Sequence, residues 1–237
     1  MKLIVLGDIH GNLRALRRAL QEAEQEGYDR IVHTGDLAGF GPHVDEVVDL
    51  LASRGIEGVR GNLDAALADG EEEPRAPLID EVTTRQAAAT LRRTSMRLSP
   101  GAIRHIGNLP FEIRLPTPTG EAALYHANPF DLSTYYQAGV PEEGLAVCIE
   151  AARAAVVVTG HAHTGFHRDL IGGHFIGAAS VGFPRDGDPR GGYTVVRFGP
   201  TIRVEHRRFA YDVEEAAREA LAMGMPEDVA QRWLRGK

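Results

Sequence analysis

The chain has 237 residues, of which 43% are hydrophobic and 25% are charged, and its formal net charge is −7. This composition is typical of a folded globular protein with a sizeable core, and it excludes a disordered chain. The excess of acidic residues argues against a general attraction to nucleic acid or to an anionic membrane, so we expect no stable nucleic-acid partner and no membrane partner.

Two features indicate the cellular compartment. Cys148 is the single cysteine, which excludes an intramolecular disulfide and a thiolate metal cage, and we expect it to be a core residue of a helix. The first apolar run, LIVL at residues 3–6, is too short for a signal sequence or a membrane span. We therefore expect a cytoplasmic protein.

The first third of the chain repeats an apolar run, a polar loop and an amphipathic helix. Residues 3–6 lead to a helix capped by Asn12, and residues 30–34 lead to a second helix with Pro42 in its first turn. A third apolar run, GVR at residues 58–60, leads to the letters GNLD. Strands alternating with helices predict βαβ units and a parallel sheet covered by helices on both faces.

An acidic stretch, DGEEEPRAP at residues 69–77, predicts a surface loop ahead of a helical insertion at about residues 78–107. No acidic residue occurs from Arg85 to Arg104 in this insertion. Two alternatives stay open for its basic side chains: a solvated helix face or subunit contact, or a cover that reaches a polyphosphate or nucleotide at the sheet edge. The arginines are Arg85, Arg92, Arg93, Arg97 and Arg104.

The second half reads as strands, with turns at Gly172-Gly173 and Gly199-Pro200. A helical tail is expected at about residues 212–236, with Asp212 capping its first helix and Pro226 opening its second. Neither a repeat nor a clear linker interrupts the chain. We therefore predict a single domain over residues 1–237.

Ligand-type side chains follow the expected strands. The spacings from Asp8 to Asp36 and from Asp36 to Asn62 are each near the ~30 residues of one βαβ unit, so these loops should meet at one sheet edge, where open α/β sheets bind ligands. Residues at i and i+2 of an extended chain project to one side, so each of two pairs, Asp8 with His10 and His161 with His163, should converge on one centre. The full candidate set is Asp8, His10, Asp36, Asn62, His126, His161 and His163.

Imidazoles, carboxylates and one amide oxygen form a mixed nitrogen and oxygen set, which suits manganese, iron, zinc or nickel better than calcium. One ion would leave several ligands unused, whereas a carboxylate such as Asp36 could bridge two ions about 4 Å apart. A single histidine in such a chain is more often structural, but a structural role for the whole set is improbable. We expect two divalent cations, with manganese as the first candidate and magnesium also open.

The chain resembles the calcineurin-like metallophosphoesterase superfamily in its motifs: Asp8-x-His10, Gly35-Asp36 with Gly39 and Gly41, Gly61-Asn62-x-Asp64, His126, and Gly160-His161-x-His163. The segments GDLAGFGP, SVGFPRDGDPRGGY and HRRFAYDVEEAA resemble a compact bacterial subgroup that includes phosphodiesterases and dinucleoside polyphosphate hydrolases.

This resemblance implies a four-layer α/β/β/α sandwich. It places one ion on Asp8, His10, Asp36 and His163, and the other on Asp36, Asn62, His126 and His161. One departure is the sequence HANP at residues 126–129, where relatives often have a glycine after the histidine; Ala127 and Asn128 would alter the backbone there.

The implied reaction is in-line attack on phosphorus by a hydroxide bridging the two ions. Phosphomonoesterases and phosphoprotein phosphatases of the superfamily usually have a histidine where this chain has Leu63, and that histidine assists the leaving oxygen. Leucine cannot donate a proton, so Asp64 loses its usual partner and would serve the fold. We therefore expect a small nucleotide-like substrate with a phosphodiester or phosphoanhydride bond. A phosphoprotein phosphatase and a non-catalytic scaffold are the alternatives.

Substrate contacts are expected from Asn12, Arg60, Arg92 and Arg93. Helix capping is the alternative for Asn12 and a salt bridge for Arg60. In the segment PRDGDPRGG at residues 184–192, a turn whose charges pair with one another is favoured over substrate binding by Arg185 and Arg190. Tyr135 and Tyr136 are expected to pack against the sheet, with stacking on a nucleobase as the alternative. The sequence leaves open whether the protein forms a homo-oligomer.

Overall fold

The computed structural model describes residues 1–74 and 81–237, apart from the side chains of residues 81–84 and 86. These parts contain ten strands and eight helices. The expected acidic loop at residues 69–77 lies partly outside the described residues, and the start of the expected insertion at residue 78 lies outside them. None of the described helices is long and apolar enough to span a membrane.

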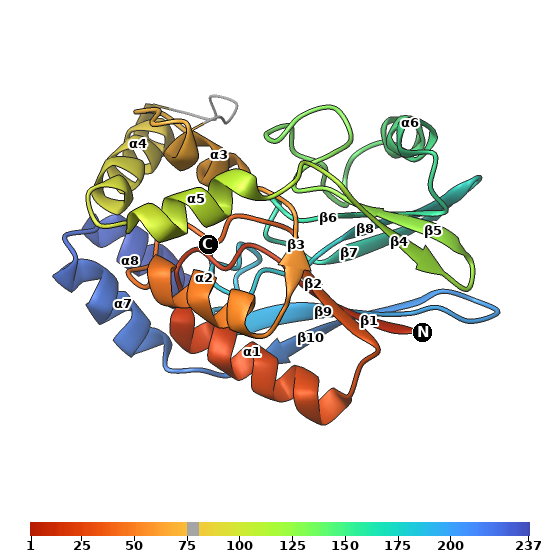
Figure 1. The fold of residues 1–237 in the computed structure, drawn as a ribbon, viewed down its shortest axis with the longest axis horizontal. Coiled ribbons are helices and arrows are strands. Elements are labelled where there is room, and N and C mark those ends of the chain that lie inside the picture. The colour runs from red at the N-terminus through yellow and green to blue at the C-terminus, as the bar shows by residue number, and fades with distance from the viewer. Residues whose placement is uncertain (75–80) are drawn as a thin grey trace.

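Two five-stranded sheets form the centre of the molecule (Figure 1). The first has the order β10-β9-β1-β2-β3, in which β1, β2 and β3 are parallel and β9 and β10 are antiparallel to their neighbours. Its strands are β1 (Lys2–Leu6), β2 (Arg30–His33), β3 (Glu57–Gly58), β9 (Gly191–Arg197) and β10 (Arg203–Phe209).

The second sheet has the order β4-β5-β6-β8-β7, with a parallel centre and antiparallel edges. Its strands are β4 (Ile113–Thr117), β5 (Gly120–Leu124), β6 (Val156–Thr159), β7 (Phe166–Leu170) and β8 (Gly173–Gly177). The expected turn at Gly172-Gly173 joins β7 to β8, and Gly172 has the positive φ of 101° that favours glycine at such a turn.

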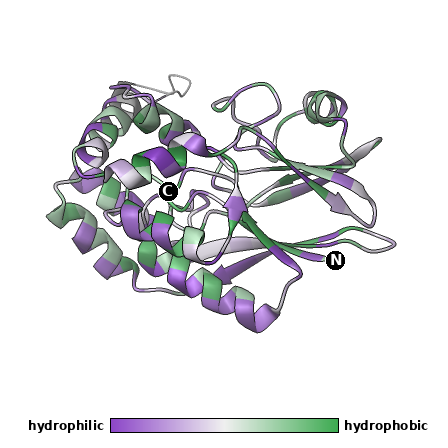
Figure 2. Ribbon diagram, in the orientation of Figure 1, coloured by the Kyte–Doolittle hydropathy of each residue, from purple (hydrophilic) through white to green (hydrophobic). Residues whose placement is uncertain are grey.

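Helices cover the outer face of each sheet. On the first sheet lie α1 (Leu13–Glu26) and α2 (Val44–Ser53), and on the second lies α6 (Glu142–Ala152), which is at the opposite side of Figure 1. The others gather beside the first sheet: α3 (Asn62–Ala68), α4 (Glu81–Ser95), α5 (Pro100–Asn108), α7 (Val213–Ala222) and α8 (Glu227–Arg235). Figure 2 shows the hydrophobic side of α1 and α2 towards the sheet and the hydrophilic side outward.

The alternation of side chains along β1 explains the layers. Ile4 and Leu6 pack with α1 and α2, whereas Leu3 and Val5 pack between the two sheets against residues such as Val156. The expectation of helices on both faces of the first sheet is therefore wrong, because the second sheet covers the inner face. The resulting order of helices, sheet, sheet and helix is the four-layer sandwich that the resemblance implies.

Three local expectations need correction. Pro42 precedes the N-cap residue His43, so it lies outside the first turn of α2. The third strand has only two residues, Glu57 and Gly58, and the letters GNLD are not all loop, because α3 begins at Asn62. This helix was not expected, although Asp64 at its third position is a recognisable N-terminal signal. The caps expected at Asn12 and Asp212 are confirmed.

The C-terminal tail belongs to the same core as α1 and α2. Trp233 in α8 is fully buried, and its Nε1 donates a hydrogen bond of 2.7 Å to the carbonyl of Gly182. Cys148 is buried in α6, as expected. A single domain over residues 1–237 stays a prediction, and the shared core is what supports it.

Replacing the anchor of the tail tests this prediction. We expect Trp233→Ala to lower the free energy of unfolding by about 3–5 kcal/mol, because a large buried side chain and its hydrogen bond are lost. Urea unfolding followed by far-ultraviolet circular dichroism measures this, and Leu234→Ala, at a 36% exposed neighbour, is the control with little expected effect. Trp233 is the only tryptophan, so in the wild type its fluorescence and the circular dichroism should change together; separate transitions would contradict a single domain.

Candidate metal centre

All seven ligand-type side chains meet at one edge of the two sheets. Asp8 and His10 follow β1, Asp36 follows β2, Asn62 begins α3, His126 follows β5, and His161 and His163 follow β6. Each of them is at least 96% buried. Neighbouring strand ends of two sheets therefore bring together residues that lie up to 155 positions apart in the chain.

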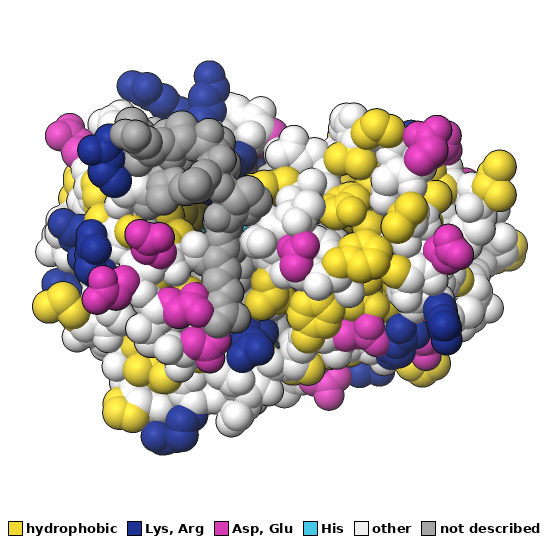
Figure 3. Space-filling view, turned by 90° about the horizontal axis from the view of Figure 1, so that it is seen from above, with side chains coloured by type: hydrophobic (Ala, Val, Ile, Leu, Met, Phe, Trp, Pro, Cys, Tyr) yellow, Lys and Arg dark blue, Asp and Glu magenta, His cyan; other side chains and the backbone are white. Residues whose placement is uncertain are grey.

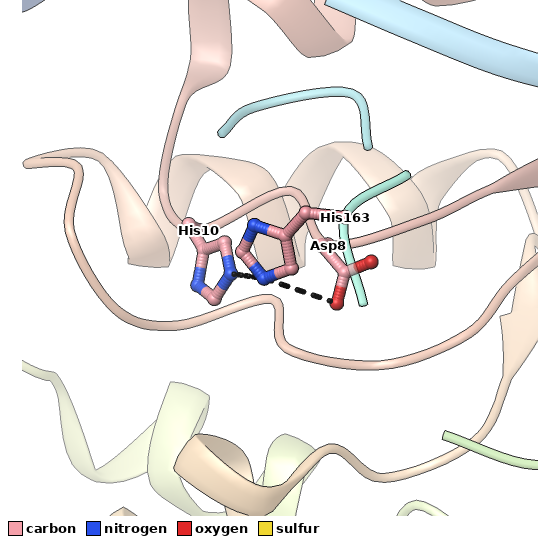
Figure 4. A group of neighbouring side chains, drawn as sticks. All are labelled: Asp8, His10 and His163. Atoms are coloured by element: carbon pink, nitrogen blue, oxygen red, sulfur yellow. Dashed lines mark hydrogen bonds and ion pairs between the residues drawn. The ribbon is translucent and has the colours of Figure 1, made fainter. Parts of the chain in front are cut away.

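The first group contains Asp8, His10 and His163 (Figure 4). Nε2 of His10 lies 3.1 Å from Nε2 of His163, and this second nitrogen lies 3.6 Å from Oδ1 of Asp8. Oδ2 of Asp8 is buried and has no hydrogen-bond partner among the described residues. Three donor atoms thus face one small volume.

The second group contains Asp36, His126 and His161, with Asn62 beside it. Nε2 of His126 lies 3.1 Å from Nδ1 of His161 and 2.9 Å from Oδ1 of Asn62. Oδ2 of Asp36 lies 3.6 Å from Nε2 of His126 and 3.9 Å from Nε2 of His10. Asp36 is therefore placed between the two groups, as a bridging carboxylate would be.

The outer nitrogen of each imidazole faces a backbone carbonyl oxygen. These contacts are His10 Nδ1 to Ala38 at 3.0 Å, His126 Nδ1 to Thr34 at 2.8 Å, His161 Nε2 to Ser133 at 2.8 Å, and His163 Nδ1 to Phe183. A carbonyl oxygen can only accept, so we assign the proton of each neutral ring to the outer nitrogen.

The inner nitrogens then face one another as bare lone pairs, in two pairs at 3.1 Å. Two such acceptors repel unless a cation or a proton lies between them. Imidazoles whose other nitrogen is held by a carbonyl are the usual arrangement around a bound metal. The donor set of the two groups therefore fits two divalent cations.

Burial keeps these rings neutral. It lowers the pKa of His10 to about 3 and that of His126 to about 4, and it lowers the pKa of His161 and of His163 well below the ordinary value. A neutral imidazole has the free lone pair that a metal requires. Burial also raises the pKa of Asp8 well above its usual range, with the charge of Asp36 as the next cause. Buried carboxylates of this kind need a cation to be stable in the charged form.

The backbone at the site is strained. Six described residues other than glycine have positive φ, and five of them are Asp8, His10, Asp36, His161 and His163. Such angles cost of order 1–3 kcal/mol each and concentrate at functional sites. They also correct the expected geometry: Asp8 and His10, with φ of 45° and 50°, are not in extended chain. The turn sends His161 and His163 into different groups, so this pair does not converge on one centre.

Glycines beside the candidate ligands permit the close packing of their loops. A Cβ on Gly61 would lie 2.1 Å from Oδ1 of Asp36, and one on Gly160 would lie 2.3 Å from Oγ1 of Thr34. Both distances are far below van der Waals contact, so any other residue would displace the site.

The loop after His126 holds His161. Asn128 is fully buried, and its Oδ1 accepts hydrogen bonds from the backbone N–H groups of Phe130 and Asp131. Asp131 in turn accepts from Ser133 N–H at 2.7 Å, and the Ser133 carbonyl meets His161. The departure HANP therefore has a structural role, because Asn128 organises this loop.

Leu63 and Asp64 serve the fold. The Asp64 carboxylate is fully buried and accepts hydrogen bonds from the N–H groups of Leu37, Ala38 and Gly61 at 3.3, 3.0 and 3.0 Å. It thereby ties the loop after β2 to the start of α3, and the expected structural role of Asp64 is confirmed. Leu63 is buried among the apolar residues that include Phe40.

Asn12 and Arg60 have partners within the protein. Oδ1 of Asn12 accepts from Ala15 N–H at 3.0 Å, and its Nδ2 donates to the Gly182 carbonyl and to the Tyr211 hydroxyl, both at 3.1 Å. Asn12 therefore caps α1, which is the alternative role considered for it. Nη1 of Arg60 donates to the Gly107 carbonyl at 3.3 Å, which is a hydrogen bond rather than the salt bridge considered. Phosphate contact by either residue stays a prediction.

The arginine-rich insertion is helical, as expected, and α4 packs on the loop after β2. Oγ1 of Thr94 donates to the Gly39 carbonyl at 3.0 Å, and Leu91 is buried in the core. Nη1 of Arg93 donates to the Ala89 carbonyl within α4, whereas Arg92 is exposed. Figure 3 shows Lys and Arg side chains on the left part of its face, where α4 lies in Figure 1, and hydrophobic side chains on the right. Substrate contact by Arg92 and Arg93 stays a prediction.

The two tyrosines behave differently. Tyr136 lies 5.9 Å from Phe175, ring centre to ring centre, and packs against the second sheet as expected. Tyr135 instead stacks on the ring of His161 at 4.1 Å. This contact with a candidate ligand was missed, because no sequence pattern relates the loop after β5 to the end of β6.

A family model for the calcineurin-like phosphoesterase superfamily domain matches residues 1–199. An uncharacterised protein of Methanocaldococcus jannaschii is 23% identical over 256 residues, which cover 99% of this chain and 98% of that protein. Both comparisons span the loops that carry all seven candidate ligands.

Solved structures share the fold. A metallophosphoesterase from Sphaerobacter thermophilus aligns with a TM-score of 0.81 at 24% identity, over 100% of this chain and 99% of that chain. A hypothetical protein of Pyrococcus horikoshii gives 0.84 at 19% identity, over 100% and 98%. A candidate diadenosine tetraphosphatase gives 0.54 at 24% identity, over 88% and 94%. The expected four-layer fold is confirmed by these alignments.

The role of Asp64 is open to a direct test. We expect Asp64→Ala to lower the free energy of unfolding by about 3 kcal/mol or more, because three backbone N–H groups at a buried position lose a charged acceptor. Chemical denaturation of the metal-free protein measures the change. Asp49→Ala, at an exposed position of α2, is the control; equal effects of the two substitutions would show that the Asp64 carboxylate does not hold the loops together.

Proposed function

The chain belongs to the calcineurin-like phosphoesterase superfamily, and from that premise we propose that it hydrolyses phosphodiester or phosphoanhydride bonds of small nucleotide-like substrates at a centre of two divalent metal ions. The observation that carries the proposal is the arrangement of four neutral imidazoles in two pairs, in each of which the two inner nitrogen atoms lie 3.1 Å apart. The candidate diadenosine tetraphosphatase with the same fold is in keeping with such a substrate.

One ion would be held by Asp8, His10, Asp36 and His163, and the other by Asp36, Asn62, His126 and His161. Divalent ions at such a centre activate water for attack on phosphorus and neutralise charge on the phosphoryl oxygens. The protein itself fixes the direction of every donor: four backbone carbonyls orient the rings, and the N–H group of Leu63 donates to Oδ1 of Asp36 at 2.9 Å. This bond leaves Oδ2 of Asp36 directed at both groups.

The leaving group receives little help from this site. Leu63 has no proton to donate, and burial keeps the four imidazoles neutral with their outer protons held by carbonyls. A missing general acid typically costs ~10² to 10⁴ in rate, and the loss is largest for a strongly basic leaving group such as an alkoxide. A nucleotide phosphate or an activated alcohol leaves more easily. This is why we favour anhydrides and activated diesters over phosphoserine.

Two alternatives make different predictions. A phosphoprotein phosphatase would use the leaving-group histidine that Leu63 replaces. A non-catalytic scaffold would have no need for a complete ligand set, whereas here all seven positions carry competent donors. The manganese identity of the ions, the cytoplasmic location and a homo-oligomeric state are further predictions that the proposed function does not require.

Metal stoichiometry tests the ligand assignment. We expect the wild-type protein, reconstituted with manganese, to bind two ions, and His126→Ala to lose most of one equivalent, because His126 would bind only the second ion. Elemental analysis and titration calorimetry measure this. The control is His167→Ala, which removes one member of another close histidine pair, at 3.0 Å between β7 and β8. Equal metal loss in both variants, or two ions in His126→Ala, would contradict the assignment.

Substrate preference tests the reaction. We expect the manganese-loaded protein to hydrolyse dinucleoside polyphosphates and bis(4-nitrophenyl) phosphate with a kcat/KM at least ~10²-fold higher than for a phosphoserine peptide, for want of a general acid. Phosphate release and nitrophenolate absorbance measure the rates. A preference for the phosphoserine peptide would favour the phosphatase alternative, and bound metal without turnover of any ester or anhydride would favour the scaffold.

A further inference from the structure

The segment after β8 contacts the first group of candidate ligands. The N–H groups of Val181 and Gly182 donate to the carbonyls of Gly7 and Asp8 at 2.7 and 3.1 Å. The carbonyl of Phe183 accepts the outer proton of His163, and the Phe183 ring lies edge-on to the ring of His10 at 6.0 Å. The backbone of residues 181–183 is therefore fixed relative to the site, and Arg185 follows two residues later.

The two aspartates that follow Arg185 each form a salt bridge with a different arginine. Asp188 forms a salt bridge of 2.6 Å with Arg190, and Asp186 pairs with Arg208 of β10. The expected self-paired turn is thus confirmed for Arg190 but is wrong for Arg185, because the second aspartate is taken by a strand that is distant in sequence. Nε of Arg185 is buried and has no hydrogen-bond partner among the described residues.

The guanidinium of Arg185 lies over the Phe183 ring, 5.8 Å from its centre. That ring lies 6.0 Å from the ring of His10 and 5.9 Å from the ring of His163, centre to centre. The cation and two candidate ligands of the first group therefore pack around the same aromatic ring.

The balance of charge calls for an anion. Asp8 and Asp36 are the carboxylates of the candidate ligand set, and Asp64 is the buried carboxylate next to it. Three negative charges do not balance two divalent cations and a guanidinium. A partly buried arginine beside bound metal ions is stable when an anion lies between them, and a guanidinium fork matches two oxygens of a phosphoryl group.

We propose that Arg185 binds substrate, with its guanidinium donating to the non-bridging oxygens of the phosphoryl group held at the metal centre. This inference rests on the proposed function. It gives the site a cation that the motif of residues 61–64 does not contain, since position 63 is leucine. The guanidinium charge would stabilise the bound phosphoryl group, but it would not supply a proton to the leaving oxygen.

The test removes the charge and keeps the packing. Arg185→Met retains an unbranched stem over Phe183, and Arg185→Lys retains the charge without the fork. Arg190→Met is the matched control, from the same turn but paired with Asp188. We expect Arg185→Met to weaken the binding of inorganic phosphate to the manganese-loaded protein about 10- to 100-fold, as for loss of a charged hydrogen bond. Arg185→Lys should be intermediate, and Arg190→Met should be within about twofold of wild type on the same basis.

Titration calorimetry measures phosphate binding, and steady-state hydrolysis of bis(4-nitrophenyl) phosphate should show the same loss mainly in KM. Metal content and thermal stability should be unchanged in all three variants. Phosphate binding by Arg185→Met that equals wild type, or an equal loss in Arg190→Met, overturns the inference. Loss of metal from Arg185→Met also overturns it, because Arg185 would then support the fold of the site.

Failure of the proposed function gives a different result. A wild-type protein that binds metal and phosphate but hydrolyses no substrate would disprove the proposed reaction, and the phosphate titrations of the variants would still decide the role of Arg185. A metal-loaded wild type that binds no phosphate would disprove the inference as well. If Arg185→Met does not fold, Arg185→Lys decides: phosphate binding equal to wild type overturns the bidentate contact.

Discussion

The site depends on one constraint: four buried imidazoles each have one nitrogen tied to a backbone carbonyl. Once the outer nitrogens carry the protons, the inner lone pairs have no assigned donor among the residues that the structure describes. Such repulsion is sustained only where another group relieves it, and under the proposed function two cations would do so for all four rings together. The orphan Oδ2 of Asp8 has the same requirement.

The fold supplies this constraint through its two sheets. The carbonyls that orient the rings come from the ends of strands and from loops of both sheets, so the packing of Leu3 and Val5 against Val156 between the sheets also fixes the distance between His10 and His163. Positive φ at five candidate ligands turns their side chains inward at an energetic cost. Three clusters of buried hydrophobic residues, one between the sheets and one on the outer face of each sheet, hold the loops firmly enough to sustain that strain.

The ends of the strands could be predicted from the sequence, because they are marked locally by short apolar runs followed by glycines and polar residues. That explains why most strands, and the meeting of the seven ligand-type side chains at one sheet edge, could be predicted. Other features depend on contacts between distant segments. Alternating apolar residues in β1 show that both faces are buried, but they cannot tell a helix from a sheet as the cover. Likewise, Asp186 pairs with Arg208 only because β10 lies beside that loop. The letters PRDGDPR alone therefore do not show that Nε of Arg185 has no hydrogen-bond partner among the described residues.

Asp64 shows how the residue at position 63 can differ while the rest of the motif is kept. Its carboxylate binds the N–H groups of Leu37, Ala38 and Gly61 and so joins the loop that carries Asp36 to the helix that begins at Asn62. That task does not involve the side chain at position 63. Because the aspartate has a structural function of its own, a leucine at position 63 is compatible with the loops that carry Asp36 and Asn62. The side chain at position 63 is thus separable from the architecture. Under the proposed function, the substrate range would change through that residue without any change to the loops of the candidate metal centre.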